Sequence, residues 1–504
     1  MTFRTIVSPL TPPPPNQNRG SDQEWVWIVS TLLVQLVASL LALKLMGAVF
    51  TSSDEYCRLV YAMQWSEHPF FATHDHVWLG GNFWLLGSML CIVNRPVLVG
   101  ILHGVLSGLL AALLGYSLLR RSGFPREVSL FGIVLFASRP VVMALSKSPQ
   151  PDMLFVAMLF GVLLCAQATF GGGIPRYRPW LCGTACVIIA QTLRYEGWFL
   201  TVPWGIVTFI LFCRALRSRD FRTTMWMVCA GMALLAFPLM WLESSRSELG
   251  SLTGFLTLMR GMLSADTPEL HSALFADRLA YYPYYTIHQM PVLIVPGLVG
   301  IAMAFRTPTW GARSGVGILA LFWISLIVNT TRIGFGNNWT YRLAIMCIGP
   351  LALYAGPGLM AICASLPRRV GPAIVGGLLL CDLSFSWSRM DTLFLSAPPD
   401  HDIVRLSGRA GKAASRSGTI RYLALDMRST PDYWGYEEWV AKVHAGPYIR
   451  VRPIITDDDW VKTLGDPVYR YALADRESLS PGFKETSKRG KYSLRVRKSS
   501  PPPE

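Results

Sequence analysis

Charged residues are scarce in this sequence, and long apolar runs take their place. Only 15% of the 504 residues are Asp, Glu, Lys or Arg, whereas 52% are hydrophobic. Soluble domains carry about a quarter charged residues. The composition therefore excludes an ordinary soluble protein and indicates a polytopic membrane protein.

Other absences narrow the range of functions. Of the 10 cysteines, only Cys57 lies outside an apolar segment, so the sequence offers neither a disulfide framework nor a zinc-ligand spacing. No glycine-rich phosphate loop follows an expected strand, and no nucleophile elbow is present. The N-terminus also lacks the pattern of a cleavable signal peptide, so we expect the first span to serve as an uncleaved anchor.

The apolar runs predict about eleven membrane spans, since one span needs about 20 apolar residues. We place them at 25–49, 95–119, 127–145, 152–169, 179–198, 199–216, 223–242, 288–305, 314–331, 341–364 and 370–386. The expected domains are a disordered cytoplasmic tail at 1–23, a membrane domain at 24–387 and a soluble domain at 388–504.

Arginine positions predict the orientation of these spans. Five alternate loops carry the basic residues: Arg120, Arg121 and Arg126; Arg176 and Arg178; Arg214, Arg217, Arg219 and Arg222; Arg306 and Arg313; Arg368 and Arg369. Such loops are cytoplasmic by the positive-inside rule. The net charge of +15 thus reflects topology, and we expect no nucleic-acid partner.

The first outer loop, residues 51–87, concentrates reactive side chains beside the membrane. Asp54 and Glu55 come directly after the first span, and His68 and the run His74, Asp75, His76 follow. These carboxylates suit a site that acts on a polar group attached to an apolar one, although a solvated loop with an aromatic belt would look similar. The imidazoles and Asp75 could also ligate a divalent metal ion.

Further candidates lie in other outer loops. Lys147 and Asp152 stand at the mouth of the span at 152–169, where Asp152 could simply favour a helix N-terminus. Arg194 and Glu196 lie at the outer boundary, where they could bind substrate or snorkel. Residues two apart do not face one another on a helix, so this spacing does not imply a pair.

Two more outer arginines run against the positive-inside bias. Arg332 and Arg342 flank the stretch IGFGNNWTY on the side where basic residues are disfavoured. This placement suggests that they meet an anionic partner there.

The C-terminal segment changes to a mixed composition. RYLALDM, YIRVRPII and YRYALAD read as strands, EEWVAKV and DDWVKTL as helices, and KETSKRGKYSLRVRK as a hairpin. The fold class is therefore an α-helical polytopic membrane protein with a small extracytoplasmic α/β domain.

A family resemblance rests on the residues already described. Asp54-Glu55 after the first span, the pattern Trp65…His68-Pro69…Asp75-His76-Val77-Trp78, Pro151-Asp152 and the stretch RYEGW resemble the glycosyltransferase C superfamily. The nearest likeness is to protein O-mannosyltransferases and aminoarabinose-transferase-like enzymes, over roughly the first 350 residues. By this resemblance Asp54 matches the catalytic loop-one acid, Glu55 its neighbour and Asp152 the second acidic position.

The resemblance implies transfer of a sugar from a polyprenyl-phosphate donor to an extracytoplasmic acceptor on protein, lipid or glycan. A carboxylate would remove the acceptor proton, with Asp54 as the base, and inversion is expected. Lys147, Arg194, Arg332 and Arg342 would stabilise the leaving phosphate. The sequence indicates no definite cofactor, and the divalent metal ion considered above is the one candidate.

Location and rival functions complete the expectations. We expect a bacterial inner-membrane protein whose active site faces outward among membrane lipid. A non-catalytic lipid or solute transporter or flippase, or a ligase of whole lipid-linked glycans, remains the alternative. Transporters place polar residues nearer the bilayer midplane.

Overall fold

The computed structural model of the protein describes residues 21–47, 50, 53–73, 76, 78–171, 176–257, 275–330, 344–367, 370–388, 401–417, 420–426, 436–454, 459, 462–463, 469–475, 483–489 and 492–497. Of the expected site residues, Asp75, Arg332 and Arg342 lie outside this described part of the chain.

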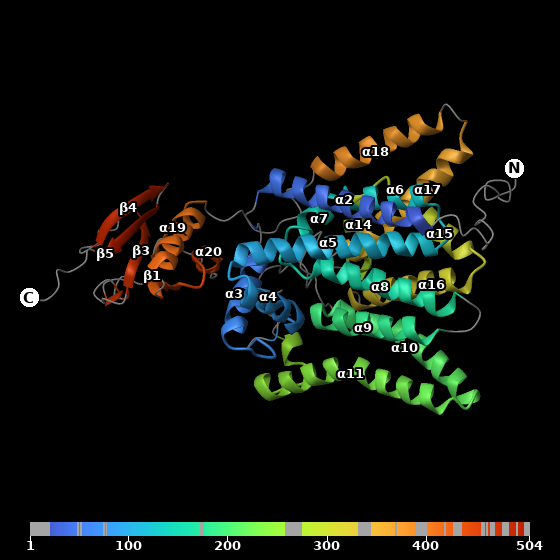
Figure 1. Cartoon of the computed structure of the whole chain (residues 1–504), viewed down its shortest axis with the longest axis horizontal. Helices are drawn as coiled ribbons and strands as arrows, with labels where there is room; N and C mark the ends of the chain where they lie inside the picture. Colours follow the sequence, from blue (N-terminus) through green and yellow to red (C-terminus); the bar gives the residue numbers. More distant parts are fainter. Residues whose placement is uncertain are drawn as a thin grey trace, which may run out of the picture.

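Helices make up the first four fifths of the described chain. In order they are α2 (Ser21–Met46), α3 (Ser53–Glu67), α4 (Gly80–Ile92), α5 (Pro96–Arg121), α6 (Arg126–Ala137), α7 (Pro140–Leu145), α8 (Asp152–Phe170), α9 (Tyr177–Leu193), α10 (Glu196–Arg217), α11 (Phe221–Leu249), α14 (Phe275–Gln289), α15 (Ile294–Arg306), α16 (Trp310–Val328), α17 (Ile345–Ser365) and α18 (Gly371–Ser388). Figure 1 shows the long helices side by side, with α11 and α18 at opposite edges and the short α3 and α4 near one end.

The protein is a multi-pass membrane protein. Within the described residues, seven helices are long and apolar enough to span a bilayer, or eight if the bent pair α14 and α15 counts as one. Outer helices such as α2 and α11 keep large apolar side chains exposed, including Leu40 and Trp226, as helices that face lipid do. The count of about eleven spans stays a prediction.

Two expected spans are interrupted in the structure. The one expected at 127–145 is divided into α6 and α7, because Pro140 begins a new helix after Ser138 and Arg139. The one expected at 288–305 corresponds to the end of α14 and to α15, which meet at 108°.

A buried ion pair joins these two interruptions. Arg139 binds Asp382 of α18, and both side chains are fully buried. The other Asp382 oxygen accepts the backbone N–H groups of Val292 (3.0 Å) and Leu293 (3.2 Å) at the start of α15. Asp382 thus satisfies N–H groups that a helix start leaves unpaired, and it neutralises a buried guanidinium.

The core of the bundle lies around α8 and α17. These are the most buried of the candidate spans. Helix α17 approaches α15 closely, because a Cβ on Gly358 would lie only 1.8 Å from the carbonyl oxygen of Pro296. Small residues at such crossings are the usual means of packing helices within a membrane.

The C-terminal part forms a sheet with helices on it. Its elements are α19 (His401–Ser417), β1 (Arg421–Asp426), α20 (Tyr436–Ala445), β2 (Ile449–Ile454), β3 (Tyr469–Asp475), β4 (Phe483–Arg489) and β5 (Tyr492–Arg497). The strand order is β2-β1-β3-β5-β4, with β1 parallel to β2 and β3, and with β5 antiparallel to β3 and β4. Most of DDWVKTL lies outside the described residues, and α19 was not expected from the sequence.

Helix α3 connects the bundle to this sheet. Buried Tyr56 lies against α20, and its hydroxyl is 3.2 Å from Nε2 of His444. At the other end of α3, Glu67 accepts two hydrogen bonds from Arg450 of β2, at 2.9 and 3.0 Å. The helix that carries Asp54 and Glu55 is therefore held from the C-terminal side as well as by the bundle.

Candidate active site at the start of helix α3

The two acidic residues of the first loop occupy the first turn of α3. A carboxylate there is favoured by the positive end of the helix dipole. Asp54 is half-buried, whereas Glu55 is only 5% exposed. The two neighbours therefore have different surroundings, and Asp54 is the more accessible of the pair.

A buried polar segment, residues 146–151, lies beside this turn. It joins α7 to α8, and all six of its residues are buried. Helix α5 approaches it so closely that a Cβ on Gly104 would lie 2.6 Å from the backbone nitrogen of Ser148. Asn82 of α4 donates to the carbonyl oxygen of Pro149 at 3.0 Å. The absence of a side chain at Gly104 and the amide of Asn82 thus allow the polar segment 146–151 to enter the bundle.

Lys147 lies within this segment and near Glu55. The residue is 3% exposed, and its ammonium group donates to the carbonyl oxygen of Gly47 at 3.1 Å. Burial lowers the pKa of Lys147, and the negative charge of Glu55 opposes that shift. The structure therefore brings together two expected site residues that are 92 positions apart in the sequence.

Three polar residues that the sequence reasoning missed complete this region. Arg58 lies one turn after Asp54, donates to Oε1 of Gln150 at 3.0 Å and stacks over the ring of Trp78 at 4.3 Å. Within the described residues, Oδ1 of Asn82 and Nε2 of Gln150 are buried without a hydrogen-bond partner. Such atoms in a native site commonly mark the position of a ligand or water.

Asp152, Arg194 and Glu196 form a second charged group. The Arg194 guanidinium binds Asp152 and makes two hydrogen bonds to Glu196, at 2.9 and 3.1 Å. Burial alone would lower the Arg194 pKa, but the two carboxylates raise it above its usual value. The second oxygen of Asp152 is buried without a partner among the described residues.

The Arg194–Glu196 pair forms because the chain is not helical at Arg194. This residue ends α9 in an extended conformation, with φ −149° and ψ 146°, and α10 begins at Glu196. The expected boundary between two spans at 198 and 199 is therefore four residues too late. The spacing of two residues along a helix gave no reason to expect the Arg194–Glu196 pair. The pair forms because the helix is broken at Arg194.

The two described histidines of the first loop lie elsewhere. His68 is exposed just after α3. His76 is buried with a φ of 51°, a left-handed conformation that is uncommon outside glycine. Its Nε2 is 2.9 Å from Oγ of Ser244, and its carbonyl oxygen accepts from the Tyr195 hydroxyl at 2.7 Å. The end of the loop is thereby attached to α11 and to the RYEGW stretch.

A metal ion was one expectation for this loop. Among the residues that the structure describes, no three His, Cys, Asp or Glu side chains gather in a way that could hold one. His74 and Asp75 lie outside those residues. We therefore derive no step through a metal ion.

Solved structures resemble this fold over almost its whole length. ArnT from Cupriavidus metallidurans bound to undecaprenyl phosphate matches with a TM-score of 0.56 and 12% identity, over 95% of this chain and 99% of that chain. Its apo state gives 0.51 and 11%, over 94% and 98%. The Archaeoglobus fulgidus oligosaccharyltransferase in complex with Zn and sulfate gives 0.47 and 12%, over 88% and 68%. A scan against protein-family models and a search of curated proteins found no match.

The two likenesses to ArnT identify the class of fold. The protein is a polytopic membrane protein with the glycosyltransferase C fold, and the resemblance seen in the sequence is confirmed at that level. Of the three structures named above, the two with a TM-score above 0.5 are both of ArnT. At 12% identity or less they establish the fold and assign no residue.

Proposed function

We propose that the protein is a membrane glycosyltransferase that moves a sugar from a polyprenyl-phosphate donor to an acceptor hydroxyl. The observation that carries the proposal is that Glu55, next to Asp54 in the first turn of α3, interacts with Lys147 of the buried segment 146–151, in a fold similar to ArnT. The ArnT structure contains undecaprenyl phosphate, which supports a lipid-phosphate donor here.

Asp54 is the general base in this proposal. The acceptor oxygen attacks the anomeric carbon, its proton passes to the Asp54 carboxylate, and the bond from the anomeric carbon to the phosphate oxygen breaks. The electron pair of that bond leaves with the polyprenyl phosphate. A single displacement of this kind inverts the configuration. Glu55 is less suited to be the base, because it is more buried and lies beside the Lys147 ammonium.

Cations near Asp54 would stabilise the leaving phosphate. Lys147 and Arg58 are the described candidates: Lys147 interacts with Glu55, and Arg58 of α3 donates to Gln150 of the same buried segment. Arg194 is already engaged by two carboxylates, so we assign it to orienting Asp152. Arg332 and Arg342 remain proposed phosphate ligands.

The donor and acceptor would meet at the outer face of a bacterial inner membrane. The positive-inside pattern supports this orientation, since the arginine-bearing loops lie at the opposite helix ends from Asp54. The donor's apolar tail would lie along the spans. Acceptors on protein, lipid or glycan all carry the required hydroxyl.

An Asp54→Asn variant tests the assignment of the base. We expect transfer to fall by about 10²- to 10⁴-fold, because the amide cannot take the proton. The donor to use in the assay is first identified by mass spectrometry of the polyprenyl lipids that co-purify with the wild type. Glu243→Gln is the matched control, since this exposed carboxylate lies on α11. Near-normal turnover by the Asp54→Asn protein would show that Asp54 is not the general base.

The same assay separates the rival functions. A flippase would move the lipid across vesicles without forming a glycosylated product, and Asn at position 54 would leave that movement intact. A ligase of whole glycans would yield a product heavier by more than one sugar. The outer-edge position of Asp54 favours transfer over transport, since transporters bind near the midplane.

A further inference from the structure

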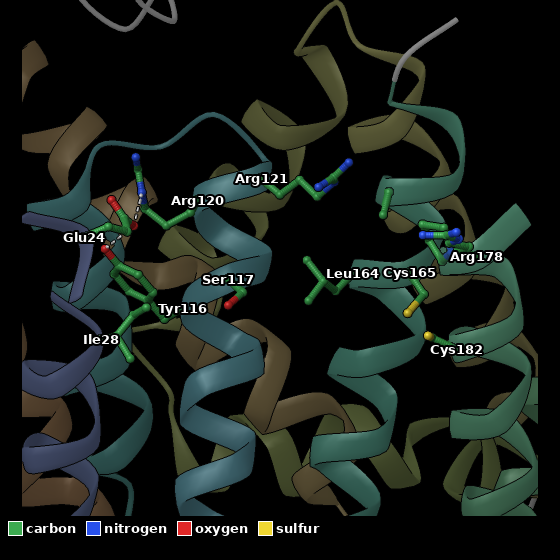
Figure 2. Close-up of a pocket in the computed structure, with 12 residues that line it drawn as sticks. Glu24, Ile28, Tyr116, Ser117, Arg120, Arg121, Leu164, Cys165, Arg178 and Cys182 are labelled. Carbon is green, nitrogen blue, oxygen red and sulfur yellow. Dashed lines mark hydrogen bonds and ion pairs between the residues drawn. The ribbon is translucent and has the colours of Figure 1, made fainter. Parts of the chain in front are cut away.

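A second site lies at the other end of the bundle. A pocket of about 730 Å³ opens between α2, α5, α8 and α9, and Figure 2 shows its charged and apolar lining. Helix α5 reaches both regions: Gly104 contacts the segment 146–151, and Arg120 lines the pocket. Sixteen residues of helix separate these two positions, or about 24 Å along the axis. The pocket is therefore distinct from the candidate active site.

The mouth of the pocket carries an excess of positive charge. Glu24 of α2 pairs with both Arg120 (3.4 Å) and Arg126 (2.7 Å). Arg121 and Arg178 make no hydrogen bond or ion pair within the part of the chain that the structure describes. In Figure 2 the Arg121 side chain extends from α5 towards α9, the helix that carries Arg178. Two cations facing one opening favour an anion between them.

The interior of the pocket is apolar. Ile28 lies four residues further along α2 than Glu24, and Cys182 lies four residues further along α9 than Arg178. Each step of four residues is about one helical turn, or about 6 Å deeper into the bundle. Leu164 of α8 lies between them as part of the lining. A charged mouth above an apolar floor suits an amphiphile better than a soluble anion.

We propose that this pocket binds an anionic phospholipid of the membrane leaflet at the arginine-bearing face. The phosphate lies between Arg121 and Arg178, and an acyl chain lies along Ile28, Leu164 and Cys182. Basic pockets between spans on the cytoplasmic side are suited to such head groups. A head group with its own ammonium brings a positive charge to the arginines and is disfavoured. The inference is independent of the proposed transferase activity.

Titration of the delipidated full-length protein with phosphatidylglycerol tests the site. Native mass spectrometry would compare wild type with the double variant Arg121→Gln/Arg178→Gln. The matched control is Arg214→Gln/Arg217→Gln, in the last turn of α10 at the same face and outside the pocket lining. Each arginine near a lipid surface contributes about a four- to sixfold gain in binding, so the double variant loses about thirtyfold. The control retains wild-type affinity.

A thiol readout on the wild-type protein does not depend on any variant. Cys182 is exposed within the pocket lining, and Cys229 is exposed on α11. Phosphatidylglycerol should slow the reaction of Cys182 with N-ethylmaleimide and leave Cys229 unchanged, as resolved by peptide mass spectrometry.

Four outcomes would overturn the proposal. They are equal phosphatidylglycerol binding by the double variant and its control, equal protection of Cys182 by phosphatidylethanolamine, protection by inorganic phosphate alone, and stronger protection by polyprenyl phosphate than by phosphatidylglycerol. The third would identify a soluble anion site, and the fourth a site for the substrate lipid.

Discussion

The pairing of buried charges determines which charged side chains of the candidate site can contact a substrate. Buried charges are costly unless they are paired, and the structure pairs most of those near the site. Asp152 and Glu196 hold Arg194, whereas Glu55 lies beside Lys147. Asp54, in the same helical turn as Glu55, is half-buried, as the proposed base needs to be to meet an acceptor from outside.

Removing Arg194 should destabilise the protein strongly. In Arg194→Ala, two buried carboxylates lose their cation, and breaking a buried pair in this way costs about 3–5 kcal/mol. Arg194→Lys keeps the charge but cannot engage both carboxylates at once, so we expect an intermediate loss. Thermal unfolding in detergent would rank the variants. Arg246→Ala, which breaks an exposed pair on α11, should change little. Equal melting temperatures for Arg194→Ala and Arg246→Ala would contradict this account.

Sequence reasoning found the acids of the site but not their polar partners. Asp54 and Glu55 stood out because they follow an apolar span directly. Arg58 and Asn82 did not, because nothing local shows that they would meet the segment 146–151. That meeting depends on how closely α5 and α4 approach the segment, which is a property of the packed bundle. The close approach at Gly104 is visible only in three dimensions.

Individual elements were predictable where their pattern was local. The helices α5 and α17 and the strands β1, β2 and β3 lie where apolar runs and alternation placed them. The breaks at Arg139 and Arg194 were missed, because hydropathy averages over a window and does not detect a local kink. Both breaks place an arginine against carboxylates from distant elements. Long-range ion pairs of this kind leave no periodic signal.

The packing of α5 on the segment 146–151 gives a prediction at this scale. A Cβ at Gly104 would meet backbone atoms of Lys147 and Ser148 at 2.6 to 2.8 Å, so the segment must shift. We expect Gly104→Ala to lower stability by about 1–3 kcal/mol and to reduce transfer. Gly231→Ala on α11 is the control, because nothing lies within 4 Å of the added Cβ. The prediction fails if the two variants have equal melting temperatures and equal activity.

The contact between α3 and α20 should weaken in acid. Burial lowers the pKa of His444 to about 4, so its ring is neutral when docked, whereas a released histidine has a pKa of about 6.5. When the pH falls below about 6.5, the His444 ring takes up a proton if it leaves the contact with α3. The contact is therefore weakened progressively from pH 6.5 towards pH 4. Hydrogen exchange of α20 should rise between pH 7 and 4.5 after correction for the intrinsic rate. His444→Gln should remove most of that change, and an unchanged pH profile in this variant would be the contrary result.

At the scale of the whole molecule, two chemically different faces lie at opposite helix ends. Helix α8 begins at Asp152 beside the candidate active site, and its far half lines the pocket that contains Arg121 and Arg178. Carboxylates such as Asp152 and Glu196 therefore lie at one face, and arginines such as Arg121 and Arg178 at the other. This asymmetry is what the positive-inside rule uses to orient a membrane protein.

A matched pair of cysteines would test the orientation. Ser218 and Ser251 lie just before and just after α11, a helix of 29 residues that is long enough to cross the bilayer, and both are exposed. Cys57 is a poor reporter, because its thiol is buried. In a protein with its native cysteines replaced, Ser251→Cys should react with a membrane-impermeant maleimide in intact cells. Ser218→Cys lies among Arg217 and Arg219 and should react only after the cells are opened. Labelling of Ser218→Cys alone in intact cells would place Asp54 in the cytoplasm and remove the proposed outward-facing site.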